Sequence, residues 1–284
     1  MAELIVAAAT PLTDDGRRLD ETAIWPMATF LAAHGADGIF ALGTTGEGML
    51  LTEEERQRAA VVFRAACRRR LIVHCGAQST DGTVRLAAHA AEIGADAVAV
   101  IAPPYFPLDA TALEEHFVAA AGACDPLPFY LYAFAPRSGY PLPVEVVERV
   151  RERAPNVAGL KVSESPWERV APYLELGLPV YIGSEPLVPR GLAAGAVGAV
   201  SGMAAALPDI VRRVVDHPDA DGEELLSRLR QALERAPFIA SVKYALGRRG
   251  VPVGPGVRRP LRALSAEEER QLDAALQDVA TPVG

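Results

Sequence analysis

Val157-Ala-Gly-Leu-Lys-Val-Ser163 is a short apolar stretch that carries a single lysine. A continuous apolar run of this length is typical of a β-strand that is buried on both faces. Similar runs recur along the chain at intervals of roughly 25 residues, with helical patterns between them. These other runs are residues 4–10, 37–43, 71–76, 97–103, 128–134, 180–183 and 196–201.

Eight strands that alternate with helices predict a parallel sheet with right-handed crossovers. With eight such units in 284 residues, the expected fold class is α/β, with the sheet closed into a (β/α)8 barrel, the TIM barrel. Residues 205–280 show helical patterns only, punctuated by Pro208, Pro237 and Pro260. We therefore interpret residues 1–215 as the barrel and residues 216–284 as a helical C-terminal extension packed on it.

Bulk composition limits the functions open to this chain. Half of the residues are hydrophobic and 23% are charged, which allows a large core. The net charge of −8 argues against a nucleic-acid-binding protein, which would carry a basic face. Three cysteines are too few and too scattered for a disulfide framework or a zinc site. We see no signal-peptide pattern and no membrane-spanning stretch, so we expect a soluble, cytoplasmic protein that does not bind membranes.

Lysine is scarce in this chain. Of the 28 Lys and Arg residues, only Lys161 and Lys243 are lysines. Arginine keeps its proton near neutral pH, whereas a desolvated lysine can lose its proton and attack a carbonyl carbon to form a Schiff base. The barrel places Lys161 near the C-terminal end of a strand, where the active sites of this fold lie. The alternative is structural, with Lys161 extending out of the strand end and pairing with Glu164.

A glycine-rich turn, Gly43-Thr-Thr-Gly-Glu-Gly48, follows the strand at residues 37–43. Its glycines allow a sharp turn whose amides point at a ligand, and the hydroxyls of Thr44 and Thr45 add donors, so the turn suits a carboxylate. It lacks the lysine of a phosphate-binding P-loop. A plain tight turn is the alternative. Glu47 could act as a base, but we favour a bracing role in which its carboxylate accepts hydrogen bonds from backbone amides.

Tyr132 and Arg137 are two further candidates near the same face. Alternation along residues 128–134 places Tyr130 and Tyr132 on one face of the strand, so the one at the strand end can reach a ligand at the barrel mouth. Arg137, in the loop that follows, can bind a carboxylate through two hydrogen bonds. The structural alternatives are a core-filling tyrosine and a surface arginine. No histidine, including His74, is predicted to be catalytic, and no spacing of ligands indicates a metal site.

Taken together, these pieces resemble the dihydrodipicolinate synthase and N-acetylneuraminate lyase family of class I, pyruvate-type aldolases. The likeness extends over nearly the whole chain. The motifs that carry it are Ala9-Thr-Pro11 with Asp14-Asp-Gly16, Gly43-Thr-Thr-Gly-Glu47, Pro104-Tyr105, Tyr132 with Arg137-Ser-Gly139, Gly159-Leu-Lys161, Gly198-Ala-Val-Ser201 and Ala240-Ser-Val-Lys243.

The resemblance implies an enzyme, a carbon–carbon or carbon–oxygen lyase, that needs no cofactor and no metal. Lys161 would form a Schiff base with C2 of a 2-oxo acid, usually pyruvate. Tyr132 would move protons to and from the carbinolamine and the second substrate. The family also implies a homodimer or a homotetramer built as a dimer of dimers, with a small-molecule oxo acid as the binding partner.

The resemblance also assigns residues that bind the substrate. Thr44 and Thr45 would hold the carboxylate of the oxo acid, in the turn that begins at Gly43. The backbone around Val200 would line the pocket. Arg137 matches the family's arginine, so it would bind an acidic second substrate.

Three departures from the family pattern bear on the substrate. Phe106 occupies the position of a tyrosine that dihydrodipicolinate synthases contribute across a dimer interface, with Tyr105 beside it as the alternative hydroxyl. Ala133 follows Tyr132 where the family usually has asparagine, and Gly43-Thr-Thr differs from the Ser-Thr pair typical of sialic acid lyases. We therefore expect the substrate to be a 2-keto-3-deoxy sugar acid or a related oxo acid.

Three other functions stay open at this point. One is a 4-hydroxy-tetrahydrodipicolinate synthase, which condenses pyruvate with aspartate semialdehyde. Another is a dehydratase that uses the same imine. The third, of a different class, is a non-catalytic barrel that binds an oxo acid.

Overall fold

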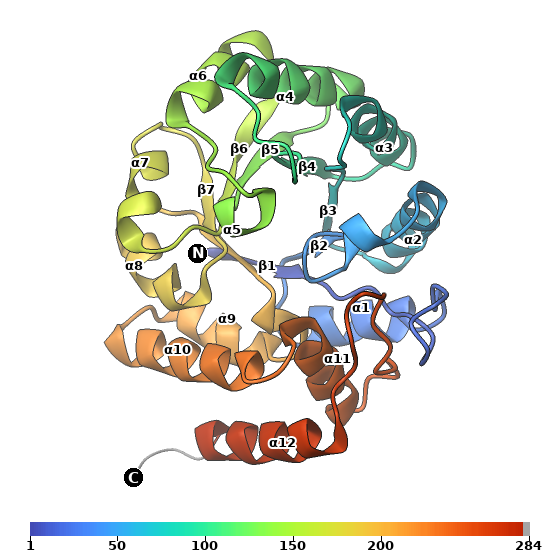
Figure 1. Cartoon of the computed structure of the whole chain (residues 1–284). Coiled ribbons are helices and arrows are strands. Elements are labelled where there is room, and N and C mark those ends of the chain that lie inside the picture. Colours follow the sequence, from blue (N-terminus) through green and yellow to red (C-terminus); the bar gives the residue numbers. More distant parts are fainter. Residues whose placement is uncertain (281–284) are drawn as a thin grey trace.

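Eight parallel strands close into a barrel in the order β1 to β8, with helices around it, in the computed structural model (Figure 1). The model describes residues 1–280, with side chains as far as Gln277. The strands are β1 (Glu3–Ala7), β2 (Gly38–Ala41), β3 (Arg70–His74), β4 (Ala97–Ile101), β5 (Phe129–Ala133), β6 (Val157–Val162), β7 (Val180–Ile182) and β8 (Gly198–Ser201). β1 pairs with both β2 and β8, with Ile5 opposite Val200. The predicted (β/α)8 barrel is therefore confirmed.

Helices follow the strands on the outside of the barrel. They are α1 (Ile24–Ala33), α2 (Glu53–Ala66), α3 (Thr80–Glu92), α4 (Ala110–Cys124), α6 (Val144–Arg153), α7 (Ala171–Leu174), α8 (Val188–Ala193) and α9 (Pro208–Asp216). Single turns of helix lie in the connections: η1 (Gly48–Leu50), α5 (Ala135–Ser138), η2 (Trp167–Arg169), η3 (Glu185–Leu187) and η4 (Met203–Ala205). Side-chain caps fix where some helices begin; Thr52 and Glu55, for instance, form a capping box at the start of α2.

Several strands end earlier than the apolar runs predicted. The run at residues 4–10 is a strand only as far as Ala7, although Ala8 and Ala9 are fully buried. These apolar residues lie beneath the loops at the C-terminal end of the barrel. Hydrophobicity alone therefore overestimates strand length, because loop residues at this end are buried as well.

A polar cluster closes the N-terminal end of the barrel. Arg70 on β3 donates hydrogen bonds to the hydroxyls of Tyr130 at 2.5 Å and Tyr181 at 3.0 Å. It also pairs with Glu3 on β1 at 3.1 Å, and Tyr181 donates a hydrogen bond to the same carboxylate. Burial, reinforced by that bond to Glu3, raises the pKa of Tyr181. The interior above this cluster is apolar, and the barrel opens at its C-terminal end.

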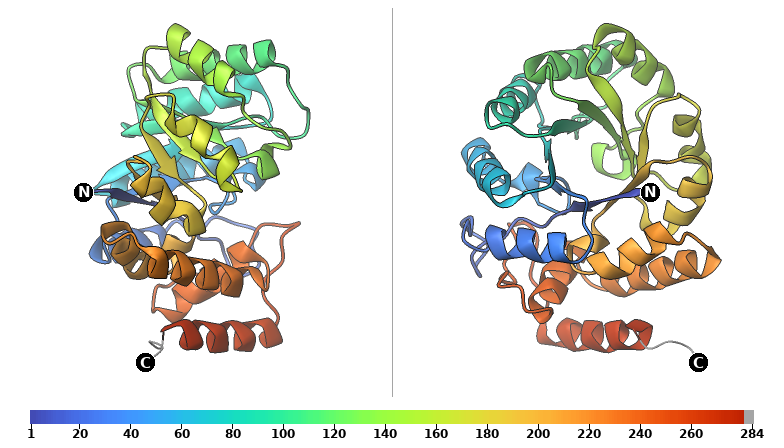
Figure 2. Two further views of the ribbon diagram at one scale, coloured as in Figure 1. Left: turned by 90° about the vertical axis from the view of Figure 1, so that its left-hand side faces the viewer. Right: turned by 180° about the vertical axis from the view of Figure 1, so that it is seen from behind.

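The C-terminal extension lies along one side of the barrel. It contains α10 (Ala220–Glu234), α11 (Phe238–Arg248) and α12 (Ala266–Ala280). α12 lies farthest from the barrel and packs on α10 and α11 (Figures 1 and 2). Residues 249–265 are not helical, contrary to the prediction, because this stretch contains four prolines and glycines in close succession, Pro252, Gly254, Pro255 and Gly256. The division of the chain at residue 215 stays a prediction.

Two further properties of residues 1–280 concern cysteines and membranes. Cys67, Cys75 and Cys124 are buried with free thiols. Within the same range, no helix is both long and apolar enough to cross a membrane.

Candidate active site

A cavity of about 890 Å³ opens at the C-terminal end of the barrel. Residues singled out from the sequence line it, among them Thr44, Thr45, Tyr132, Lys161 and Val200. They come from the ends of β2, β5, β6 and β8, so strands far apart in sequence meet here. Active sites of this fold lie at this end of the barrel. The cavity is therefore the candidate active site.

Lys161 lies on β6 with its side chain inside the barrel, and only 5% of the residue is exposed. Its Nζ is 3.8 Å from the centroid of the Tyr132 ring and 4.7 Å from that of Phe40. Among the described residues no carboxylate pairs with this amine. The structural alternative is wrong, because Glu164 instead accepts a hydrogen bond from the backbone N of Ala135 at 2.6 Å. Within the described residues, the amine therefore lies at the cavity without a counter-charge.

The glycine-rich turn presents Thr44 and Thr45 to the cavity. The Thr44 Oγ1 lies 3.5 Å from the Tyr132 hydroxyl, at the outer limit of a hydrogen bond. Gly43 does not line the cavity itself; a side chain there would begin 2.5 Å from the Phe40 ring. Gly43 therefore allows the turn to pack closely on the barrel interior.

Glu47 braces the turn rather than facing a ligand as a free base. Its side chain is fully buried, and one oxygen accepts a hydrogen bond from the backbone N of Arg258 at 2.6 Å. The other oxygen lies 2.5 Å from the Nζ of Lys243. The favoured bracing role is confirmed, but the partners come from the C-terminal extension, which the sequence did not predict.

Tyr132 and Tyr130 share the interior face of β5, as alternation predicted. Their environments differ, because Tyr130 belongs to the polar cluster at the N-terminal end and Tyr132 lines the cavity. The ring of Tyr132 packs edge-on against Phe40, with ring centroids 6.0 Å apart. Its hydroxyl is left with one distant partner, Thr44, within the described residues.

His74 is a cavity residue that the sequence reasoning missed. It is the last residue of β3, is 2% exposed, and its ring packs edge-on against Tyr132 with centroids 6.0 Å apart. Its Nδ1 lies 3.1 Å from the carbonyl oxygen of Leu42. Burial, with the positive charges of Arg56 and Lys161, holds the pKa of His74 well below its usual value. His74 is thus an uncharged residue in the wall of the site, and its surroundings suit packing better than proton uptake.

Arg56 on α2 holds the strand end that carries His74. Its guanidinium is buried and donates to the backbone oxygens of His74 at 2.8 Å and Gly76 at 2.9 Å. Strand alternation could have found His74, because Ile72 and His74 share a face. No sequence pattern near Arg56 indicates that its guanidinium supports the strand end that carries His74.

Arg137 lies at the rim of the cavity, in the single turn α5 rather than in a plain loop. It is exposed, stacks over the Phe134 ring at 5.8 Å, and has no carboxylate partner within residues 1–277. Three serine hydroxyls also line the cavity without a hydrogen-bonding partner in the described part of the chain: Ser163, Ser165 and Ser184. Arg137 and the three serine hydroxyls can therefore form hydrogen bonds with a polar ligand in the cavity.

Tyr105 does not replace the missing tyrosine within its own chain. Tyr105 and Phe106 are 82% and 69% exposed, and neither lines the cavity. Tyr105 has a positive φ of 86°, which turns the loop after β4 outward.

The extension supplies the outer wall of the cavity. Phe238, Ile239, Leu261 and the charged residues Arg230, Glu234 and Arg262 line that wall. The sequence reasoning missed this contribution. No group of three or more potential metal ligands occurs among the described residues.

Comparisons with known proteins agree with this geometry. The family model described as the dihydrodipicolinate synthetase family matches residues 1–279. An uncharacterized DapA-like lyase of Halobacterium salinarum is 36% identical, over 97% of this chain and 93% of its own. A 4-hydroxy-tetrahydrodipicolinate synthase of Methylococcus capsulatus is 34% identical, over 92% and 93%.

Solved structures show the same architecture. Escherichia coli YagE, a prophage protein of the dihydrodipicolinic acid synthase family solved in complex with pyruvate, superposes with a TM-score of 0.92 at 25% identity, over 98% of each chain. Proteus mirabilis N-acetylneuraminate lyase superposes with a TM-score of 0.88 at 28% identity, over 99% of each chain.

Proposed function

Because this chain belongs to the dihydrodipicolinate synthetase family, whose members are lyases of the class I aldolase type, we propose that it captures pyruvate or a related 2-oxo acid as a Schiff base on Lys161. One observation carries the proposal. The Lys161 amine is buried at the cavity, beside Tyr132, and pairs with no carboxylate in the described chain. A purely structural lysine in such a place would be expected to have a charged partner.

The proposed mechanism uses the residues that meet at the cavity. Thr44 and Thr45 hold the carboxylate of the oxo acid through amides and hydroxyls. The Nζ of Lys161 attacks C2, Tyr132 passes protons to and from the carbinolamine, and loss of water gives a protonated imine. In cleavage, the C3–C4 bond breaks, its electrons enter the imine as an enamine, and the proton of the C4 hydroxyl leaves through Tyr132. Protonation of C3 and hydrolysis release pyruvate and the aldehyde.

A 2-keto-3-deoxy sugar acid is the proposed substrate class. The free hydroxyls of Ser163, Ser165 and Ser184 can hydrogen-bond to the hydroxyl groups of such a substrate. Arg137, which is exposed and has no carboxylate partner among residues 1–277, can bind an acidic end of the second substrate.

The synthase named for several relatives is the second candidate, and a specific observation limits it. Phe106 stands at the position of the tyrosine that these synthases contribute across a dimer interface, and because Phe106 has no hydroxyl, that position cannot extend the relay from Tyr132. A dehydratase and a non-catalytic oxo-acid-binding barrel are separated by the assays below. Assembly as a homodimer or homotetramer and a cytoplasmic location stay predictions.

Borohydride reduction in the presence of pyruvate tests the proposal. The expected product carries a covalent mass on the peptide that contains Lys161. Lys161→Arg is the matched control, because it keeps a positive charge but cannot form the imine. A wild-type protein that gains no mass would refute the proposal, and mapping of the mass to Lys243 would relocate the chemistry.

A panel of second substrates then separates the alternatives. Aldehyde release from 2-keto-3-deoxy acids indicates an aldolase, and formation of a 2,5-dioxo acid indicates a dehydratase. Consumption of aspartate semialdehyde with pyruvate indicates the synthase. Pyruvate binding without a trapped imine or turnover on any member of the panel indicates a binding protein.

A further inference from the structure

A buried ion pair links the glycine-rich turn to the C-terminal extension. Lys243 on α11 and Glu47 in the turn have side chains with 0% exposure, and their charged atoms lie 2.5 Å apart. The Nζ of Lys243 also donates a hydrogen bond to the backbone oxygen of Gly256 at 2.7 Å. A buried pair must overcome a large desolvation cost, so its presence calls for an explanation beyond stability.

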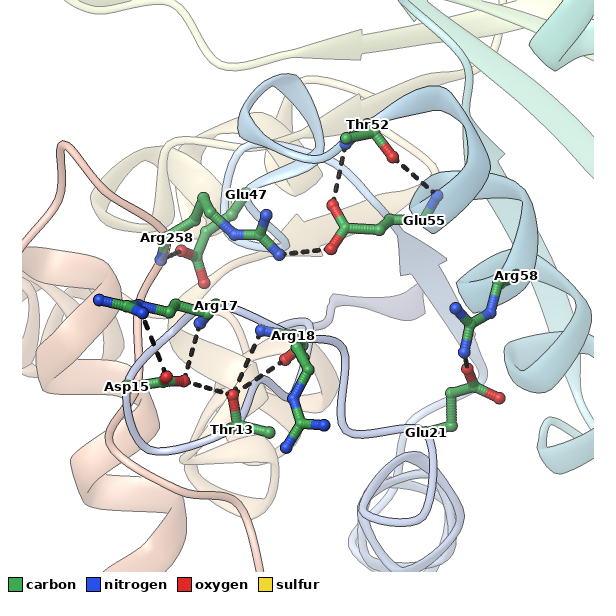
Figure 3. Close-up of polar contacts among 10 residues, drawn as sticks. All are labelled: Thr13, Asp15, Arg17, Arg18, Glu21, Glu47, Thr52, Glu55, Arg58 and Arg258. Carbon is green, nitrogen blue, oxygen red and sulfur yellow. Dashed lines mark hydrogen bonds and ion pairs between the residues drawn. The ribbon is translucent and has the colours of Figure 1, made fainter.

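The segment that contains Gly256 runs between two loops at the mouth of the barrel. Its next residues include Arg258, whose backbone N donates to Glu47 at 2.6 Å and whose guanidinium donates to Glu55 at 2.7 Å. Figure 3 shows Arg258 between these two carboxylates, with Glu55 also closing the capping box at Thr52. The segment is therefore tied both to the turn and to the start of α2.

Close backbone contacts fix this segment against the loop after β1. A Cβ on Gly256 would lie 2.0 Å from the backbone oxygen of Thr13, and one on Gly16 would lie 2.0 Å from the backbone oxygen of Val257. Side chains cannot be accommodated at such distances. The segment is thus held from both sides, which makes it a firm support for Glu47.

The turn needs such a support because its backbone is strained. Leu42 and Glu47 have φ values of 62° and 57°, in the left-handed region that side chains rarely adopt. Strained residues of this kind persist only where their surroundings fix them. Thr44 and Thr45 lie between these two points. Their positions consequently depend on what holds Glu47.

We propose that Lys243 and Glu47 are positioning residues, which hold Thr44 and Thr45 in the geometry that binds the carboxylate of the oxo acid. This inference rests on the proposed function, which assigns the carboxylate to the two threonines. In this arrangement the extension shapes the substrate site from behind, in addition to lining its outer wall. Neither Lys243 nor Glu47 takes part in the chemistry at Lys161.

The test measures pyruvate binding without imine formation. In a Lys161→Ala background, pyruvate is titrated and its dissociation constant is measured by ligand-observed NMR. Adding Glu47→Gln or Lys243→Met should weaken binding by about tenfold to a hundredfold, the cost of small misplacements of binding groups. The matched control is Glu3→Gln, which removes a carboxylate that pairs with Arg70 at the opposite end of the barrel. It should leave the dissociation constant within about twofold of its parent, as distant independent sites do.

The double variant Glu47→Gln with Lys243→Met separates positioning from stability. Each single change leaves one charge buried without its partner, whereas the double variant buries no unpaired charge and should recover much of the thermal stability. Pyruvate binding should stay weak in the double variant, because the ion pair that ties the turn to α11 is gone. Recovery of binding together with the melting temperature would overturn the proposal, as would single variants that bind like their parent.

The proposed function can fail separately from this inference. The wild-type protein could form no borohydride-trapped adduct while the Glu47 and Lys243 variants still bind pyruvate more weakly than their parent. In that case the positioning role of these two residues is supported and the imine on Lys161 is refuted. If trapping succeeds and the binding differences are absent, the positioning role is wrong and the imine stands.

Discussion

Replacement of Tyr132 by phenylalanine should separate catalysis from stability. Within the described residues, the hydroxyl has one partner, the Oγ1 of Thr44 at 3.5 Å, so its loss should lower the free energy of unfolding by less than about 1 kcal/mol. The ring, which packs on Phe40 and lies 3.8 Å from the Lys161 Nζ, stays in place. Removal of a general acid–base group should slow the reaction by about 10² to 10⁴-fold, or about 3–5 kcal/mol in the activation barrier.

Exchange of the methyl protons of pyruvate in D2O gives an assay that needs no second substrate. Enamine formation on Lys161 allows C3 to take up deuterium, and proton NMR follows the loss of the methyl signal. The Tyr132→Phe variant should exchange far more slowly than wild type and unfold at nearly the same denaturant concentration. An exchange rate within about threefold of wild type would contradict the proton-transfer role, since a lost acid–base group costs at least about a hundredfold.

Tyr130→Phe is the matched control on the same strand and the same face. Its hydroxyl accepts a hydrogen bond from Arg70 at 2.5 Å and lies at the closed end of the barrel. Hydrogen bonds to charged groups contribute about 1.5–3 kcal/mol, and the partial exposure of Arg70 favours the lower end of that range. The expected result is the reverse of that for Tyr132: a lower melting temperature with exchange at the wild-type rate. Equal loss of exchange in both variants would show that the assay reports general damage.

Two predictions concern stability. Burial lowers the pKa of His116 to about 4 in the folded protein. As the pH falls, this imidazole therefore takes up a proton in the unfolded chain at a higher pH than in the folded protein. This residue should therefore reduce the free energy of unfolding by about 3 kcal/mol between pH 6.5 and 4, a loss that His116→Gln removes in melts across that range. Arg56→Met leaves the backbone oxygens of His74 and Gly76 buried without partners and should cost about 2–5 kcal/mol in denaturant unfolding. Arg58→Met, which removes an exposed pair with Glu21 from the same helix, should cost less than about 1 kcal/mol; equal losses would contradict the burial argument.

The barrel and the residues that meet at its mouth could be predicted from the sequence. Parallel strands buried on both faces leave continuous apolar runs, and alternation decides which side chains face the interior. Those two rules place Lys161 and Tyr132 inside the barrel at its open end, where the structure has them. The same rules also place His74 there, on the same face of its strand as Ile72.

The support behind the site could not be predicted, because it consists of contacts between residues distant in sequence. Glu47 was expected to accept hydrogen bonds from backbone amides. No residue near it in the sequence indicates that the donor is the amide of Arg258 or that Lys243 is the counter-charge. The helical prediction for residues 249–265 failed where proline and glycine are dense, in the segment that passes close to the backbone of Thr13. Local sequence patterns do not indicate which distant residues such a segment contacts.

The two lysines show what can be inferred from the rarity of lysine in this chain. Both Lys161 and Lys243 are buried, so a rule that buried lysines are reactive would select both. Their partners distinguish them: Lys243 is held by the Glu47 carboxylate and the Gly256 carbonyl, while Lys161 faces two aromatic rings and the cavity. Arginine could not replace either one easily, because a planar guanidinium is larger than the ammonium that fits at both positions. Scarcity therefore marks places where a compact amine is needed, and the absence of a counter-charge around Lys161 in the described chain is what favours Lys161 over Lys243 for the proposed imine.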